Sequence, residues 1–478
     1  MKKISSTPGR ILSAMSLLLF VILWAVWFFC FRYYHIWLEG YSLFTTLPDF
    51  ATIYERIPHG FTGYIGAFLH QFYAMPFLGA AIQAALAVWP VVCSGIILIR
   101  LFKNPSGMMW IASIPMLVVV FRQFWDLLLV YTLNTCLIFT ALLIAVCLVT
   151  LVWKPGWKSP DFLSFRFLNL IVTSAVAAVS VYVLVFMDPR NREHEELARL
   201  EYLGENREWM EILQRVSVQD AAADALKRHY ALLALSETGN LKEYAFRYGL
   251  KGSDGFIFYE NIDPMSLNYN ALFYQCLDMH NAVIQQSYQL GIQSVPGIGA
   301  ASLRRLADTY LELKDYELAK KYIEILSHTT CHRKWVKERL PQLEAIRDAA
   351  PEYGVDEHKS VIADFAHTLS SMVDRNPENQ KYSDLLLCAL LADEEGDKFK
   401  NIFRYIAKWQ YPDGMNIPRL YEEALVLIYS VDPSVLDGIT ISEDTWKDFA
   451  DYMQMMNTGR GTQALRKYAD TYWAYSYR

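Results

Sequence analysis

The stretch that decides the fold is residues 167–200, FLNLIVTSAVAAVSVYVLVFMDPRNREHEELARL, where an apolar run gives way to a charged one. No charged side chain occurs before Asp188 in this stretch. A helix needs about 20 apolar residues to cross a hydrocarbon layer about 30 Å thick. The sequence therefore predicts a membrane helix followed directly by a water-exposed one. This junction divides the chain into a transmembrane domain, residues 1–188, and a soluble domain, residues 189–478.

Further apolar stretches precede this junction. Three of them are long enough to cross a bilayer, and a fourth, residues 105–121, lies at the lower limit of length and contains Pro115. The first apolar stretch is longer than the core of a signal peptide and is followed by no small-residue cleavage site, so we expect it to be retained. We predict five transmembrane helices, at residues 11–31, 77–99, 105–121, 127–153 and 167–187.

Basic residues in the short connecting segments indicate the orientation. They are Lys2, Lys3, Arg10, Arg100, Lys103, Lys154, Lys158 and Arg166. With five spans, all of these segments lie on one face, which the positive-inside rule makes cytoplasmic. The N-terminus is then cytoplasmic and residues 189–478 are periplasmic, at the inner membrane. Without the weak span the orientation of the C-terminal half would reverse, but the basic loop near Lys158 would lie outside; we therefore prefer five.

Charge differs between the two predicted domains. Lys and Arg outnumber Asp and Glu by 11 to 6 in residues 1–188, whereas acids outnumber bases by 44 to 33 in residues 189–478. An acidic soluble domain argues against general nucleic-acid binding, which requires clustered positive charge. Cys276, Cys331 and Cys388 of this domain form no CxxC pair. The sequence thus permits one disulfide there but excludes a disulfide framework.

Residues 303–331, LRRLADTYLELKDYELAKKYIEILSHTTC, match the pattern of a tetratricopeptide repeat. Small residues let two antiparallel helices approach, and large residues fill the spaces around them. The turn carries Lys314-Asp315 where the pattern prefers Gly. Looser copies around this unit predict a TPR-like α-solenoid, and an all-α protein overall. The residues that define the packing are Leu303, Leu306, Ala307, Tyr310, Tyr316, Ala319, Ile323 and Leu326.

The segment between the first two spans, residues 32–73, is rich in aromatic residues. Apolar residues between positions 44 and 57 recur at helical spacing, which predicts an amphipathic segment on the outer membrane surface. Multi-span glycosyltransferases that use polyprenyl-phosphate-linked sugars resemble this layout. In that interpretation Glu39 or Asp49 would be the base or a metal ligand, together with His59. The alternative, which we favour, is that these residues solvate the polar face of the segment.

Other patterns carry less information. His328, Cys331 and His332 have the spacing of two ligands on one helix turn, but they lack the Glu of a zinc-protease motif. Residues 295–303, VPGIGAASL, resemble a DNA-binding hairpin but fit a helix start better. Arg122 and Asp126 have the spacing of a helical ion pair. We therefore expect no metal, no cofactor and no nucleic-acid partner.

The chain resembles uncharacterised multi-span inner-membrane proteins of Bacteroidota with a tetratricopeptide-like C-terminal domain. The resemblance rests on residues 60–73, GFTGYIGAFLHQFY, on Leu78-Gly79, on Arg207-Glu208-Trp209, and on the unit that begins at Leu303. It implies an inner-membrane location and no particular activity. We predict a membrane-anchored helical-repeat protein that contacts membrane lipid and binds an envelope protein or peptide. The alternative is the glycosyltransferase described above.

Overall fold

The computed structural model describes residues 7–55, 59–126, 129–153, 155–158, 166–259, 263–294, 297–353 and 365–477. Within these ranges the chain forms helices and turns without a β-strand, and one isolated bridge joins Phe102 to Trp157. The predicted all-α class is therefore confirmed. Lys2, Lys3 and Lys154, which contribute to the predicted orientation, lie outside the described residues, as do Val295 and Pro296.

Contacts divide the chain into two compact units. The first unit comprises Met1–Arg199, Leu290–Leu311 and Tyr316–Ala349, and the second comprises the remaining residues, Leu200–Gln289, Glu312–Asp315 and Ala350–Arg478. This division differs from the predicted boundary between residues 188 and 189. The predicted boundary came from hydropathy, which reflects whether a segment prefers hydrocarbon or water. The compact units reflect packing instead. The two differ because residues 290–311 and 316–349, which are polar enough for water, pack with the N-terminal helices.

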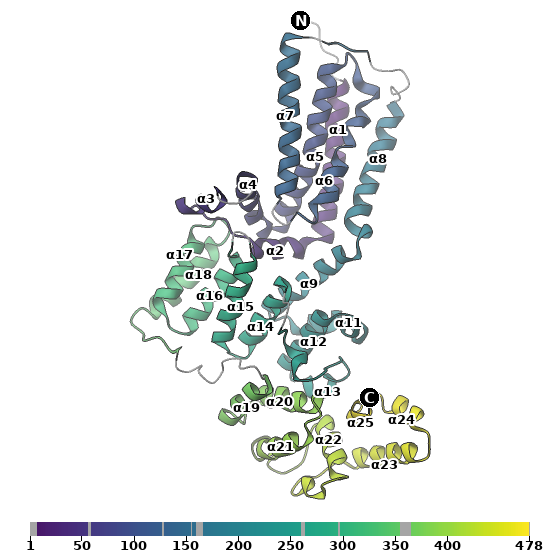
Figure 1. The fold of residues 1–478 in the computed structure, drawn as a ribbon, viewed down its shortest axis with the longest axis vertical. Helices are drawn as coiled ribbons and strands as arrows, with labels where there is room; N and C mark the ends of the chain where they lie inside the picture. The colour runs from purple at the N-terminus through teal and green to yellow at the C-terminus, as the bar shows by residue number, and fades with distance from the viewer. Residues whose placement is uncertain are drawn as a thin grey trace. The chain divides into compact units, whose positions relative to one another are not determined.

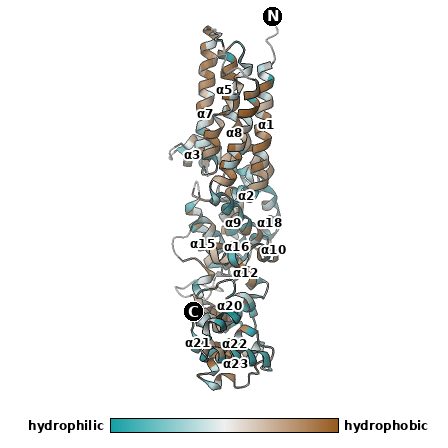
Figure 2. Ribbon diagram, turned by 90° about the vertical axis from the view of Figure 1, so that its right-hand side faces the viewer, coloured by the Kyte–Doolittle hydropathy of each residue, from teal (hydrophilic) through white to brown (hydrophobic). Residues whose placement is uncertain are grey.

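Four helices of the described chain are long and apolar enough to cross a membrane, and all four belong to the first unit (Figures 1 and 2). They confirm the helices predicted at residues 11–31, 77–99, 127–153 and 167–187. The last ends in a π-helical turn, Val183–Met187. The helices are α1 (Thr7–Cys30), α5 (Pro76–Leu101), α7 (Val130–Val152) and α8 (Arg166–Tyr182).

The fifth predicted span, residues 105–121, is not a continuous membrane-length helix. It consists of the 3-10 turns η2 (Pro105–Gly107) and η3 (Met109–Ser113) and the short helix α6 (Met116–Gln123). Pro115 at the N-cap of α6 contributes to the break, because proline lacks the amide hydrogen that a continuous helix would use at this position. The side chain of Asn169 accepts from the amide of Trp110 (2.9 Å) and donates to the carbonyl of Ser106 (2.6 Å).

This irregular segment extends along α8. Its start lies beside Asn169, in the first turn of α8, and α6 contacts the turn Val183–Met187 at the other end. The bridge between Phe102 and Trp157 joins the connection before the segment to the one after α7.

The segment between α1 and α5, residues 32–73, contains three helices: α2 (Arg32–Tyr41), α3 (Pro48–Glu55) and α4 (Gly60–His70), followed by the turn η1 (Gln71–Ala74). Only part of it fits the prediction of a surface segment. Phe61 and Phe68 of α4 are exposed, but six of the ten residues of α2 are buried. α2 is therefore an internal element of the first unit.

The predicted repeat unit contains the expected helices, α16 (Ala300–Glu312) and α17 (Tyr316–Ser327), followed by α18 (Arg333–Ala345). All the predicted packing residues except Tyr316 are buried, and the ring of Tyr310 stacks on that of Tyr322 at 5.7 Å. Arg339 of α18 forms an ion pair with Asp308 of α16 at 2.7 Å. Lys314, in the turn, has φ of +56°, which explains the preference for glycine at this position.

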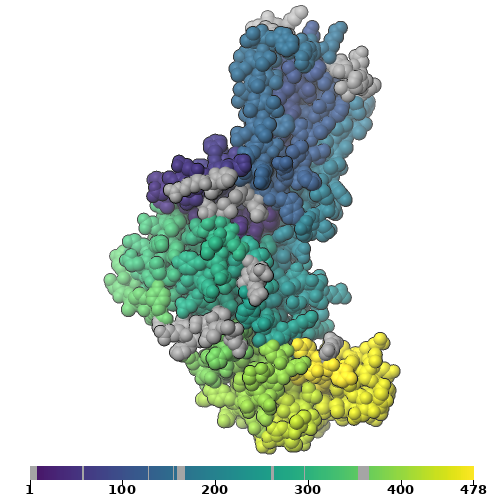
Figure 3. Space-filling model, viewed as in Figure 1, coloured from purple at the N-terminus to yellow at the C-terminus, as the bar shows by residue number. Residues whose placement is uncertain are grey.

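The second unit is a set of short helices connected by tight turns, many capped by side chains such as those of Ser217, Asp224 and Asp263. α9 (Pro189–Glu205) begins in the first unit and ends in the second. Tyr452, Tyr468 and Trp473 form a buried aromatic core near the C-terminus. The surface of this C-terminal part is yellow in Figure 3. The remaining helices are α10 (Trp209–Arg215), α11 (Val218–Ala223), α12 (Ala225–Glu237), α13 (Leu241–Tyr244), α14 (Pro264–Cys276), α15 (His280–Gln293), α19 (Phe365–Arg375), α20 (Gln380–Ala392), α21 (Gly396–Gln410), α22 (Arg419–Tyr429), α23 (Glu443–Asn457), α24 (Gly461–Lys467) and α25 (Tyr472–Ser476).

Two glycines allow α2 to approach the start of α16 closely. A Cβ at Gly299 would lie 2.5 Å from the carbonyl oxygen of Gly40, and a Cβ at Gly40 would lie 3.1 Å from the Cβ atom of Ala301. The amide of Ala300 donates to the carbonyl of Ser42 at 3.0 Å, which fixes this approach.

We predict that Gly299→Ala destabilises the first unit, because the added methyl meets a backbone atom that no rotamer change can move. Overpacking of this kind costs about 1–3 kcal/mol, and thermal unfolding of the purified full-length protein in detergent would measure it. The control is Gly291→Ala, where the nearest atom to a Cβ is 3.6 Å away. An equal loss of stability in both variants would contradict the prediction.

Candidate functional site

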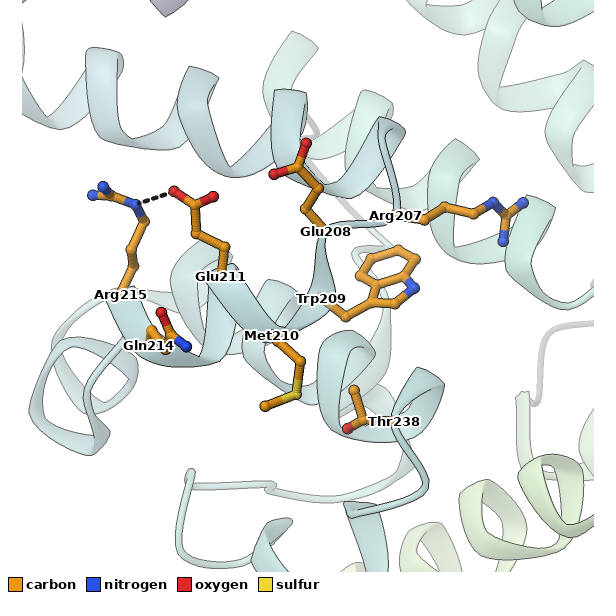
Figure 4. Close-up of a pocket in the computed structure, with 8 residues that line it drawn as sticks. All are labelled: Arg207, Glu208, Trp209, Met210, Glu211, Gln214, Arg215 and Thr238. Atoms are coloured by element: carbon orange, nitrogen blue, oxygen red, sulfur yellow. Dashed lines mark hydrogen bonds and ion pairs between the residues drawn. The ribbon is translucent and has the colours of Figure 1, made fainter.

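A hollow of about 800 Å³ opens in the second unit, where α9 ends and α10 begins (Figure 4). We call it the Trp209 groove. Apolar and charged side chains line it together. They are Arg207, Glu208, Trp209, Met210, Glu211, Gln214, Arg215 and Thr238.

A helix-ending motif creates this groove. The amide of Glu208 donates to the carbonyl of Leu203 at 2.8 Å, and that of Arg207 donates to Gly204 at 2.9 Å. These two bonds form a Schellman motif, whose C′ residue takes the left-handed conformation. Arg207 occupies that position with φ of +57°. The chain therefore turns sharply, and α10 starts at Trp209 and packs on α12.

The charged groups of the groove do not converge on a common point. Figure 4 shows Arg207 and Arg215 extending to opposite sides, and Arg215 lies 3.4 Å from Glu211 of its own helix. Met210 is 58% exposed beside the partly buried indole of Trp209. No His, Cys, Ser or Asp lines the groove. This arrangement provides apolar contact and charge at the rim, which suits binding rather than nucleophilic catalysis.

Glu39, one of the predicted site residues, is buried in the first unit. Its carboxylate lies 2.7 Å from Nε2 of His332, which follows α17. The adjacent cavity holds about 10 Å³, roughly the minimum volume for one water molecule. Burial alone would raise the pKa of Glu39, but the charge and hydrogen bond of His332, with Arg304 and His70 nearby, lower the pKa overall.

Two further buried histidines lie near this pair. The rings of His35 and His70 flank Tyr73, with centroids 4.7 and 4.8 Å from it, and all three side chains are fully buried. Neither nitrogen of either imidazole, nor the hydroxyl of Tyr73, has a hydrogen-bond partner in the described structure. Burial lowers the pKa of His35 to about 3, with a contribution from His70, and that of His70 to about 4.

The other predicted site residues lie elsewhere. Asp49 is exposed in the first turn of α3, and His59 is exposed at the start of α4. Within the described chain, neither of them shares a hydrogen bond or a cavity with Glu39. The described residues between α1 and α5 therefore do not bring Glu39, Asp49 and His59 together in one open pocket.

The residues of the other motifs in the sequence do not form sites either, within the part of the chain that the structure describes. Within the described residues no group of three His, Cys, Asp or Glu side chains could hold a metal, and all seven cysteines are free. Asp126 accepts from the amide of Thr132 at 2.6 Å and does not pair with Arg122, since α6 ends at Gln123 and the helical spacing is lost. Sequence reasoning missed the Trp209 groove; its only signal was the triplet Arg207-Glu208-Trp209.

The buried histidines predict a pH dependence. Because the folded-state pKa of His70 is about 4 against an ordinary 6.5, protonation favours the unfolded state as the pH falls below 6.5. Stability decreases there by up to about 1.4 kcal/mol per pH unit for each such histidine. We expect thermal unfolding of His70→Asn between pH 7 and 5 to be less pH-dependent than that of the wild type.

The exposed residue His59 provides the control, and His59→Asn should keep the wild-type pH dependence. Burial raises the pKa of Glu195 to about 7, so this residue changes the stability in the opposite direction as the pH falls. Its contribution is the same in the wild type and the variants, and the comparison between them removes it. The same slope in wild type and His70→Asn would contradict the prediction.

Comparison with known proteins gives one match. A model described as a family of unknown function (DUF6057) matches residues 8–187 and 158–478. No curated protein and no solved structure matches the chain significantly. Since the two matched regions cover nearly all of the sequence, the chain belongs to this family of unknown function.

Proposed function

We propose that the protein is a membrane-anchored receptor whose Trp209 groove binds an extended segment of an envelope protein. The observation that carries this proposal is the groove of about 800 Å³, which combines an indole, an exposed methionine and two arginines. Trp and Arg are the residues that most often dominate protein–protein binding energy, and Met is enriched at such surfaces. No second function is proposed, because Glu39 lies in a space for one water and Asp49 faces solvent.

The backbone at Arg207 makes this position suitable for a test of the proposal. A non-glycine residue in the left-handed region costs roughly 1–2 kcal/mol, and Asp278, Lys314 and Glu394 take the same conformation at other helix ends. Glycine would form the turn at residue 207 without this cost. The guanidinium can therefore be removed from the rim of the groove without loss of the turn.

We also propose five membrane crossings. Residues 105–123 are close to the lower limit of length for a membrane-spanning α-helix. The 3-10 turns lengthen the segment, because they rise about 2.0 Å per residue against 1.5 Å in an α-helix. On this basis η2, η3 and α6 extend about 30 Å. Their course from Asn169 to the turn Val183–Met187 supports a full crossing.

Five crossings and the positive-inside rule place the N-terminus in the cytoplasm and the C-terminal residues in the periplasm, at the inner membrane. We propose in addition that α16 and α17 are a tetratricopeptide-like repeat, supported by the burial of Leu303, Ala307 and Ala319. The receptor would then present its groove to the envelope space.

Photo-crosslinking tests the binding site. A photoreactive amino acid at Met210 of the full-length protein, in native membranes, should give a discrete adduct with one envelope protein. The control position is Val431, which is 87% exposed in the same unit and lies outside the groove. Trp209→Ala should reduce the adduct at Met210 by at least about tenfold, as expected for a dominant contact residue.

Arg207→Gly separates binding from stability. This variant should be at least as stable as the wild type because the left-handed strain is relieved, yet it should lose most of the adduct because the guanidinium is gone. The same adducts at Met210 and Val431, or full labelling in both groove variants, would contradict the proposed site.

The orientation predicts the behaviour of C-terminal reporter fusions. Alkaline phosphatase is active only outside the cytoplasm, and it should be active when fused after Arg478. Green fluorescent protein fused at the same position should not fluoresce. The control is a fusion in the loop after α7, near Lys158, where the two results should be exchanged. Phosphatase activity at Lys158 and not at the C-terminus would reject five crossings.

A further inference from the structure

A second hollow lies within the first unit, between α4, α5 and α7. Its volume is about 300 Å³, at the lower end of the range for small-ligand pockets. Ile65, Ala85, Leu86, Leu133 and Leu137 contribute its apolar walls. We call it the α4–α7 groove. Figure 1 shows α4 beside the end of the bundle at which α7 begins.

The groove reaches into the zone that a bilayer would occupy. Trp89 and Thr140 line its deep end. Trp89 lies about 20 Å along α5 from Pro76, and Thr140 lies about 15 Å along α7 from Val130, at 1.5 Å per residue. Both helices are long and apolar enough to span a membrane. The deep end of the groove is therefore surrounded by hydrocarbon if these helices span.

The polar groups at this deep end satisfy one another. The indole nitrogen of Trp89 donates to the hydroxyl of Thr140 at 2.9 Å, and that hydroxyl donates to the carbonyl of Cys136 at 2.7 Å. The thiol of Cys136 donates in turn to the carbonyl of Leu86 at 3.4 Å. Since unpaired polar groups are costly in hydrocarbon, this chain of bonds makes the deep end suitable for an apolar occupant.

Hydrogen-bond donors lie near the other end of the groove, before the start of α4 and in the first turns of α7. Nδ1 of His59 lies 3.5 Å from the side-chain amide nitrogen of Asn134, and its ring centroid is 6.5 Å from that of Tyr131. The imidazole of His59 does not cap α4. The backbone carbonyl of His59 accepts from the hydroxyl of Thr62, a residue of the groove, at 3.0 Å. These three side chains do not line the groove themselves, but they lie beside two residues that do, Thr62 and Leu133. An imidazole, an amide and a phenol next to an apolar groove match the phosphate and ester oxygens of a lipid headgroup.

We propose that the α4–α7 groove binds one phospholipid of the surrounding bilayer. One acyl chain fills the groove down to Trp89 and Thr140, and the phosphate headgroup contacts His59, Asn134 and Tyr131. The bound lipid fastens α4 to the membrane helices. This inference rests on the membrane placement of α5 and α7 and is independent of the Trp209 groove.

A photoactivatable lipid tests the proposal with the full-length protein. Nanodiscs contain phosphatidylethanolamine and phosphatidylglycerol, with a small share of phosphatidylglycerol that carries a diazirine on one acyl chain. After irradiation, mass spectrometry should locate adducts mainly in the peptides of α4, α5 and α7. Ala85→Phe, which fills the groove, should reduce these adducts at least fivefold.

The matched control is Ala178→Phe, at an exposed alanine of α8, which should leave labelling of the groove unchanged. Leu137→Trp fills the groove from α7, so that the result does not depend on the folding of Ala85→Phe alone. The thermal stability of each variant is measured, and labelling is compared between proteins of equal stability. Adducts spread evenly over α1, α7 and α8, or unaffected by both groove variants, would overturn the proposal.

A headgroup control separates specific binding from contact with any hydrocarbon. His59→Leu should lower labelling by the photoactivatable phospholipid at least threefold, and labelling by a diazirine-bearing alkane without a headgroup should remain at the wild-type level. Equal responses of the two probes to His59→Leu would overturn the assignment of a phospholipid.

Discussion

The contact between Glu39 and His332 is the constraint on which the first unit depends. A buried carboxylate needs a partner close by, and removing one member of such a pair costs about 3–5 kcal/mol. Here the partner stands 293 positions later in the chain and is met at 2.7 Å. α2 is held at its other end as well, where the amides of Tyr33 and Tyr34 donate to Glu195 of α9 at 3.2 and 2.8 Å. The side chains of two glutamates, Glu39 and Glu195, therefore hold α2 at both ends.

The membrane helices could be predicted because apolar length is a local property of the sequence. The exception, residues 105–121, failed as a regular helix for reasons that are only partly local. Pro115 is visible in the sequence, but Asn169, which supplies hydrogen bonds to Ser106 and Trp110, is remote. The pair α16–α17 was predictable because the alternation of small and large residues encodes close packing, and Lys314 shows that the turn keeps its shape without glycine.

The sites were far less predictable. The sequence around Glu39 suggested a polar side chain on a surface helix. No neighbouring residue in the sequence indicates that His332 pairs with Glu39 or that Gly299 packs against the end of α2. The Trp209 groove arises from a helix end without the glycine that normally marks one, since Arg207 adopts φ of +57°. The α4–α7 groove joins residues from three helices, all of which individually read as ordinary apolar or interfacial positions.

The first unit is built from stretches of chain that the ribosome makes at different times. Leu290–Leu311 and Tyr316–Ala349 leave the ribosome well after the helices α1–α8 have been made. During that interval α2 has neither His332 nor Ala300 against it, and its acid must remain hydrated. The membrane part thus matures in two steps, insertion first and closure around α2 later. A chain that stops after residue 187 would lack both later partners of α2, His332 and Ala300.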